Sequence, residues 1–141
     1  MSMNHARFGL MGIFVGSLVV QLVALFVTRS QLWQEDFQAL MVKLLGIYSV
    51  QLGVVLGGIF AQPKAPLANP PVGLSLTAMV LAVLWNLLLI ARFLAFCFAE
   101  RDSVGALVQY LDSVATSSSF LVAGVVVFFF GKGTAAAGSA E

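Results

Sequence analysis

Five polar residues near the C-terminal end of the chain have the types and the spacing to line a path for ions or water. Gln109, Asp112, Ser113, Thr116 and Ser119 follow one another at helical spacing, so a helix places them on one face, the polar stripe. An acid and hydroxyl groups around an axis are typical of cation pores. Ser and Thr also hydrogen-bond neighbouring membrane helices, and this packing interpretation is favoured because it is their commoner use.

Arg92 is a cation inside an apolar run, where a charge needs either water or a partner. Its long side chain can extend to the membrane surface, or it can form an ion pair. We expect Asp112 to be the partner in preference to Glu100, because Asp112 enters the membrane from the same side on the neighbouring helix. An Arg92–Asp112 pair would lower the cost of burying both charges.

Two isolated amides, Gln51 and Asn86, lie near the middle of apolar segments, and Gln21 is a possible third. An amide at that depth usually bonds another amide or a backbone carbonyl across a helix contact. Substrate binding is the alternative, but scattered amides form no motif. The residues therefore predict buried interhelical hydrogen bonds.

Small residues recur every four positions in two segments, at Gly12 and Gly16 and again at Ser49, Gly53 and Gly57. Such faces let helix backbones approach closely. They predict helix packing, either within one chain or between chains.

The elements that must position these residues are four long apolar segments. We expect helices over about 8–28, 32–60, 72–98 and 104–131, each long enough to cross a hydrocarbon core of ~30 Å. The second and fourth begin with amphipathic parts, and Trp33 suits a membrane interface. Hydrophobic residues make up 60% of the chain and charged residues 9%, against about 45–50% and about 25% in soluble domains. The sequence predicts an all-α integral membrane protein.

This protein is expected to be a single four-helix domain over residues 1–131, followed by a disordered tail over 132–141. The four prolines cluster in one loop between the second and third helices. The same unit occurs twice, a spanning helix and then a long helix, and an offset of 67 residues aligns Leu40 with Leu107 and Leu44 with Leu111. Both units start on one membrane face, which predicts parallel repeats. The charge distribution only leans towards both termini being cytoplasmic.

Several functions are excluded by what the sequence lacks. The single histidine, His5, lies in the short N-terminal segment, and Cys97 is the single cysteine, so no metal or catalytic constellation forms. We therefore expect no enzyme activity and no cofactor. The net charge of +1 indicates no nucleic-acid partner.

Three functions remain open for a multi-pass protein whose first partner is the lipid bilayer. The leading hypothesis is a self-associating protein that forms a homo-oligomeric channel or pore, since four helices alone enclose no lumen. The alternative is an accessory or anchor subunit that docks other membrane protein subunits. The third is a small cation-coupled transporter that uses Asp112 or Glu35.

Overall fold

A computed structural model describes residues 3–60, 72–99 and 103–130, which are helical apart from short links. The long helices are α1 (Met3–Val27), α2 (Gln34–Phe60), α3 (Val72–Phe98) and α4 (Val104–Phe130), and a short 3₁₀ helix, η1, covers Arg29–Gln31. No strand occurs among the described residues. The expected all-helical class is therefore confirmed.

Three helices contain spans long and apolar enough to cross a membrane. They are His5–Val27 in α1, Gln34–Gly57 in α2 and Val72–Phe98 in α3. In α4 the parts Val104–Phe120 and Val122–Phe129 meet at a bend of 54°, so the described residues hold three such spans, or four when this bent pair is counted as one. The helix expected over 104–131 is thus observed as a bent helix that ends at Phe130.

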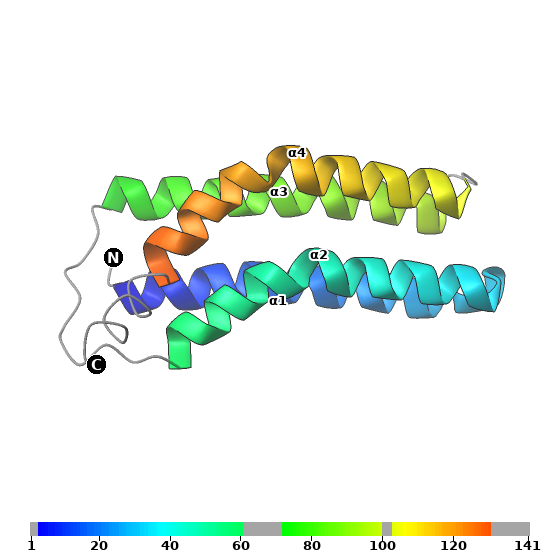
Figure 1. The fold of residues 1–141 in the computed structure, drawn as a ribbon, viewed down its shortest axis with the longest axis horizontal. Coiled ribbons are helices and arrows are strands. Elements are labelled where there is room, and N and C mark those ends of the chain that lie inside the picture. Colours follow the sequence, from blue (N-terminus) through cyan, green and yellow to red (C-terminus); the bar gives the residue numbers. More distant parts are fainter. Residues whose placement is uncertain (1–2, 61–71, 100–102, 131–141) are drawn as a thin grey trace, which may run out of the picture.

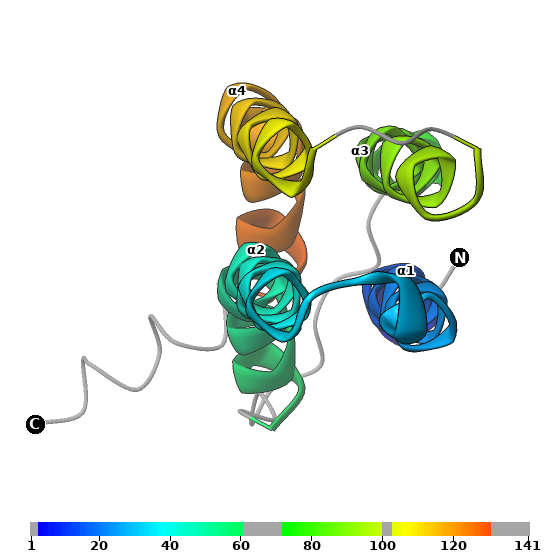
Figure 2. The same ribbon diagram turned by 90° about the vertical axis from the view of Figure 1, so that its right-hand side faces the viewer.

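The four long helices form an up-and-down bundle in which consecutive helices are antiparallel (Figure 1). Seen from one end, α1 and α4 occupy opposite corners, with α2 and α3 at the other two (Figure 2). Each corner helix therefore packs on two neighbours, and α1 lies beside α3 in the same direction, as α2 does beside α4. The predicted parallel units have this arrangement, and the aligned Leu40, Leu107, Leu44 and Leu111 are all fully buried.

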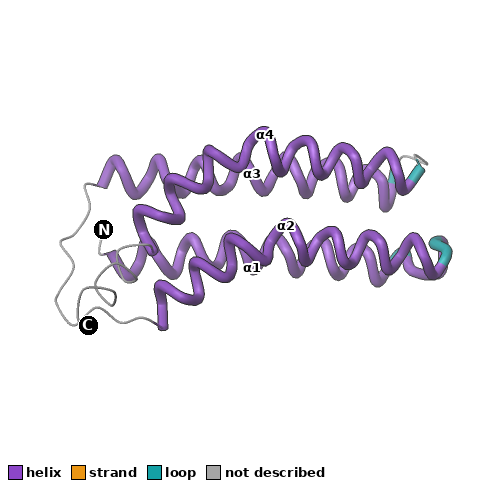
Figure 3. Tube along the Cα trace, in the orientation of Figure 1, coloured by secondary structure: helices purple, strands orange, loops and turns teal. Residues whose placement is uncertain are grey.

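The link between α1 and α2 is a short turn at one end of the bundle, and it is longer than the expected residues 29–31 because α1 ends at Val27 and α2 begins at Gln34 (Figure 3). The Thr28 hydroxyl donates to the carbonyl of Ala24 (2.9 Å) and the chain then turns through η1, where the Gln31 amide donates to the Thr28 carbonyl (2.9 Å). Leu32 is extended, so α2 begins at Gln34 and not at the expected residue 32. Acids at Glu35 and Asp36 suit this helix start because they face its positive dipole end.

Helix α1 begins earlier than its apolar run, at Met3 where residue 8 was expected. Arg7 is consequently part of the helix and is only 6% exposed. Its Nε donates to the carbonyl of Phe129 at 2.6 Å, which joins the first turns of α1 to the end of the bent α4. The third helix begins and ends where expected. The proline loop and the tail lie outside the described residues.

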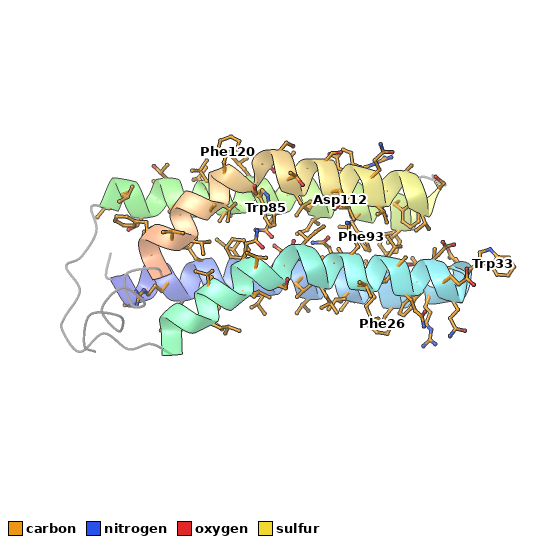
Figure 4. All side chains as sticks on the ribbon, viewed as in Figure 1. Phe26, Trp33, Trp85, Phe93, Asp112 and Phe120 are labelled. Carbon is orange, nitrogen blue, oxygen red and sulfur yellow. The ribbon has the colours of Figure 1, made fainter. Side chains whose placement is uncertain are left out.

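The core lies between the α1–α2 and α3–α4 layers and is built around Trp85. Its indole is fully buried and packs on the rings of Phe14 (centroids 6.0 Å apart) and Tyr48 (5.7 Å). Figure 4 shows Trp85 and Phe93 between the layers, while Trp33 projects from the end of the bundle and is 83% exposed. The interior is therefore filled by side chains.

Candidate functional site

The polar stripe of α4 points away from the bundle. Its first four residues are exposed and Ser119 is half-buried. The buried residues of α4, which include Leu107, Leu111 and Val122, lie on the opposite side of the helix. The stripe therefore lines no space inside a single chain.

One member of the stripe reaches another helix. Asp112 forms an ion pair with Lys43 of α2, and the two side chains are 52% and 26% exposed. At about 1.5 Å per residue, Asp112 lies roughly 12 Å along α4 from Val104. The pair thus bridges the outer seam between α2 and α4, well inside the length of both helices.

Arg92 of α3 contacts an aromatic ring of α4. Its guanidinium lies over the ring of Tyr110, 5.7 Å from the centroid, in a cation–π contact. Asp112 pairs with Lys43 because α4 packs on α2 as well as on α3, so a cation of α2 is within reach of this carboxylate.

The hydroxyl groups near the bend of α4 bond to their own helix. Ser117 donates to the Ser113 carbonyl, Ser118 donates to the Val114 carbonyl, and Ser119 donates to the Thr116 carbonyl (2.9 Å). Side-chain bonds of this kind compete with the backbone ladder and bend helices. They give a physical cause for the 54° bend.

Inside the bundle, three side chains from three helices form a central cluster: Gln21, Tyr48 and Asn86. Gln21 Nε2 donates to the Tyr48 hydroxyl oxygen (2.7 Å), and that hydroxyl donates to Asn86 Oδ1 (3.0 Å). Asn86 Nδ2 donates to the Ala82 carbonyl (2.7 Å) and Gln21 Nε2 to the Ser17 carbonyl (3.3 Å). The cluster ties α1, α2 and α3 together near the middle of α2 and α3.

Gln51, the other predicted amide, lies one turn after Tyr48 on the same face of α2. Its Oε1 is buried and has no hydrogen-bond partner among the described residues. Tyr48 itself was missed by an argument that considered amides alone. Its spacing from Leu40, Leu44 and Gln51 is a helical signal that could have found it, since a buried tyrosine usually needs a hydrogen-bond partner.

Within the described residues, the predicted packing glycines make no close helix contact. A Cβ atom added at Gly12, Gly16, Gly53 or Gly57 would meet nothing within 4 Å. Ser49 is exposed, and its hydroxyl donates to the Gly46 carbonyl of its own helix (2.8 Å). Gly9, which was not singled out, does lie at a contact, because its added Cβ would be 2.6 Å from Cε of Met79. These small-residue faces therefore lie on the outer surface of α1 and α2.

Metal-ligating groups do not gather anywhere in the described part of the chain: no three His, Cys, Asp or Glu residues lie close enough to hold an ion.

Cys97 is buried, and its Sγ accepts a hydrogen bond from the Thr28 hydroxyl at 3.7 Å. This contact joins the end of α3 to the end of α1.

Comparison with known proteins adds no name to this arrangement. No protein-family model matches the sequence, and no curated protein or solved structure matches the chain. The molecule therefore offers two groups of polar side chains as candidate sites, the stripe outside the bundle and the cluster inside it.

Proposed function

We propose that this chain is an integral membrane protein whose copies associate into a small pore, with the polar stripe of α4 facing the axis. The observation that carries the proposal is the outward direction of the stripe. Gln109, Asp112 and Thr116 are exposed on a helix that also exposes Phe120 and Val127. Carboxylate and amide groups facing acyl chains are costly, and association of several stripes would surround them with water.

The membrane location is supported by the outer surface of the bundle. α3 exposes a row of large apolar residues that includes Leu76, Val80, Leu84 and Leu87. In water, an apolar surface of this extent would promote aggregation. Each helix of 27 residues, such as α3, is about 40 Å long at 1.5 Å per residue, which exceeds a hydrocarbon core of about 30 Å.

The order of the helices suggests how copies would meet. α4 lies diagonally opposite α1, so turning α4 towards an axis puts α2 and α3 on the two flanks (Figure 2). The α2 flank is a shallow surface of Gly46, Ser49 and Gly53, and the α3 flank carries the larger Leu and Val side chains. Small-residue surfaces favour close helix contact. A repeated α2-to-α3 contact is heterologous, and such contacts form a ring when the rotation between successive copies closes.

A direct test measures the mass of the assembly and the ionic current that it conducts. The protein purified alone in nanodiscs is expected to form one closed oligomer of several copies that conducts ions in planar bilayers. Asp112→Asn leaves Lys43 uncompensated, so the reversal potential under a salt gradient is expected to shift towards anion selectivity. Lys43→Gln should shift it in the opposite direction. Glu35→Gln is the matched control, since it removes an exposed acid at the start of α2, outside the stripe.

Two results would contradict the pore. One is a monomer or dimer as the only species; the other is unchanged selectivity in an intact Asp112→Asn assembly. A reproducible foreign chain recovered from native membranes together with a monomeric purified protein would favour the accessory-subunit alternative. In that case the same small-residue flank of α2 would dock the partner.

A further inference from the structure

The outward face of α4 changes from polar to apolar at the bend of this helix. Its exposed polar residues include Asp112 and Thr116. Phe120 follows Thr116 by four residues, so it lies on the same face one helical turn further on. Among the described residues of α4, Phe120 is the most exposed large apolar side chain, at 70%. An aromatic ring therefore follows the polar stripe, roughly 12 Å along the helix from Asp112 at about 1.5 Å per residue.

The bend puts this ring on the outermost part of α4. The straight part Val104–Phe120 ends at this residue, and the part Val122–Phe129 leaves at 54° to it. The second part turns towards α1, where the Phe129 carbonyl accepts a hydrogen bond from Arg7 Nε at 2.6 Å. Figure 4 shows Phe120 on the outer side of the bend. A helix bent in this way comes closest to a neighbour on that side at the bend, and there it presents Phe120.

The hydroxyl groups at the level of the bend are directed to their own helix. Ser117, Ser118 and Ser119 each donate to a backbone carbonyl three or four residues earlier. Their hydroxyl hydrogens are therefore not available to bind water beside the Phe120 ring. This level of α4 is less able to hold water than the level of Asp112, where a carboxylate is exposed.

We propose that Phe120 forms the gate of the pore: the Phe120 rings of successive copies meet around the axis and make an apolar constriction that blocks ions while it is dry. This inference rests on the proposed pore and names the element that regulates it. Hydrophobic constrictions in channels gate by loss of water. The polar stripe holds water along the path, whereas the ring of Phe120 side chains does not, so the barrier lies at the bend. A change in the angle of the bend would move the rings apart and open the path.

Single-channel recording of the purified protein in planar bilayers tests the gate. The original protein should spend most of its time closed. Phe120→Ser makes the constriction polar and should raise the ratio of open to closed time by about tenfold or more, since the burial of a phenyl ring shifts an equilibrium by a factor of this order. Phe8→Ser is the matched control. Phe8 is 63% exposed on α1, which lies diagonally opposite α4 (Figure 2), so its substitution should leave the ratio unchanged.

Two further variants separate the ring from the bend. Phe120→Ala removes the ring without adding a hydroxyl group that could bond to the helix, and it should also open the pore. Phe120→Leu keeps a large apolar side chain and should leave the pore mostly closed. Opening by Phe120→Ser with no opening by Phe120→Ala would assign the effect to the bend and overturn the gate.

The mass of each variant assembly is measured in nanodiscs before its currents are interpreted. If Phe120→Ser does not assemble, Phe120→Ala takes its place with the same expectation. If neither assembles, the ring is a contact that holds the copies together, and the gate is overturned.

Failure of the gate and failure of the pore give different records. A conducting assembly with the same ratio of open to closed time in the original protein, Phe120→Ser and Phe120→Ala overturns the gate and leaves the pore standing. Intact assemblies that pass no current in the original protein or in any variant overturn both. A silent original protein together with a conducting Phe120→Ser assembly supports both.

Discussion

The central cluster and the polar stripe contain similar chemical groups, amides and hydroxyls along the middle of the helices, yet the bundle treats them differently. Gln21, Tyr48 and Asn86 bond one another across three helices. The stripe of α4 faces outwards, and its one bond to another helix within the described residues is Asp112 to Lys43. The cluster is therefore enclosed within one folded chain, whereas the stripe is open to the surroundings of the chain. This difference separates residues that stabilise the bundle from residues available for function.

The largest expected effect is on the inner region. Trp85→Ala removes the fully buried indole that contacts Phe14 and Tyr48, and we expect it to lower the free energy of unfolding by about 3–5 kcal/mol. The measurement is unfolding by SDS in mixed micelles, followed by helical circular dichroism. Trp33→Ala at the exposed end is the matched control and should change stability by less than about 0.5 kcal/mol. Equal effects of the two substitutions would remove the distinction between inside and outside.

The second prediction concerns the hydroxyl that links the central cluster. Tyr48→Phe leaves Gln21 Nε2 with one acceptor fewer and Asn86 Oδ1 without its donor, so we expect a loss of about 1 kcal/mol in the same assay. Tyr110→Phe, on the half-exposed ring beneath Arg92, removes the same atom and should be within about 0.5 kcal/mol of the original protein. If Tyr48→Phe leaves the free energy of unfolding unchanged, the hydrogen bonds of the cluster add no stability.

The third prediction concerns a glycine on the outer face of α2, where a substitution should stabilise the monomer and weaken association of the chains. Gly53→Ala adds a methyl group that meets nothing within 4 Å, and the monomer should gain about 0.5–1 kcal/mol because glycine weakens helices. Association, measured by analytical ultracentrifugation in detergent, should weaken if the α2 flank is a contact surface. Gly9→Ala is the control within the bundle: its methyl would lie 2.6 Å from Cε of Met79, so its gain should be smaller. Unchanged association in Gly53→Ala would remove the α2 flank from the proposed contact.

The smallest effect on stability is expected at the stripe itself. Asp112→Asn breaks the ion pair with Lys43, but Asp112 is 52% exposed, and exposed pairs contribute little, so the loss should be about 0.5 kcal/mol or less. Exchanging the charges, with Lys43→Asp and Asp112→Lys together, should restore it in the SDS unfolding assay. If Asp112→Asn lowered the free energy of unfolding by several kcal/mol, the Lys43–Asp112 pair would stabilise the fold as the central cluster does, and the comparison between the two regions would fail.

The helical segments were largely predictable, and their ends were less so. The apolar run over 72–98 defines α3 directly, since its length and composition act locally. Residues 3–7 were excluded from α1 because three of them, Asn4, His5 and Arg7, are polar. The helix nevertheless includes them, since polar residues also form the backbone hydrogen bonds of a helix. The bend in α4 was also missed, because the sequence does not show that the hydroxyl groups of Ser117 and Ser118 bond back to carbonyls of their own helix.

The site residues show the same division. Periodicity placed Gln109, Asp112 and Thr116 on one face, and the structure has them on one exposed face. Periodicity did not give the partners. Lys43 for Asp112 and Tyr48 for Asn86 come from α2, and they follow from the order of the helices around the bundle.

The sequence by itself determined that the chain forms long apolar helices and that each carries a small set of polar or small residues on a definable face, because helix length and helical period are local properties. Only the tertiary structure decided which faces turn inwards. Helices α1 to α3 bring Gln21, Tyr48 and Asn86 together inside. The same packing leaves the α4 stripe and the glycine faces outside. Inward and outward are set by contacts between helices far apart in the chain, and no local pattern encodes them.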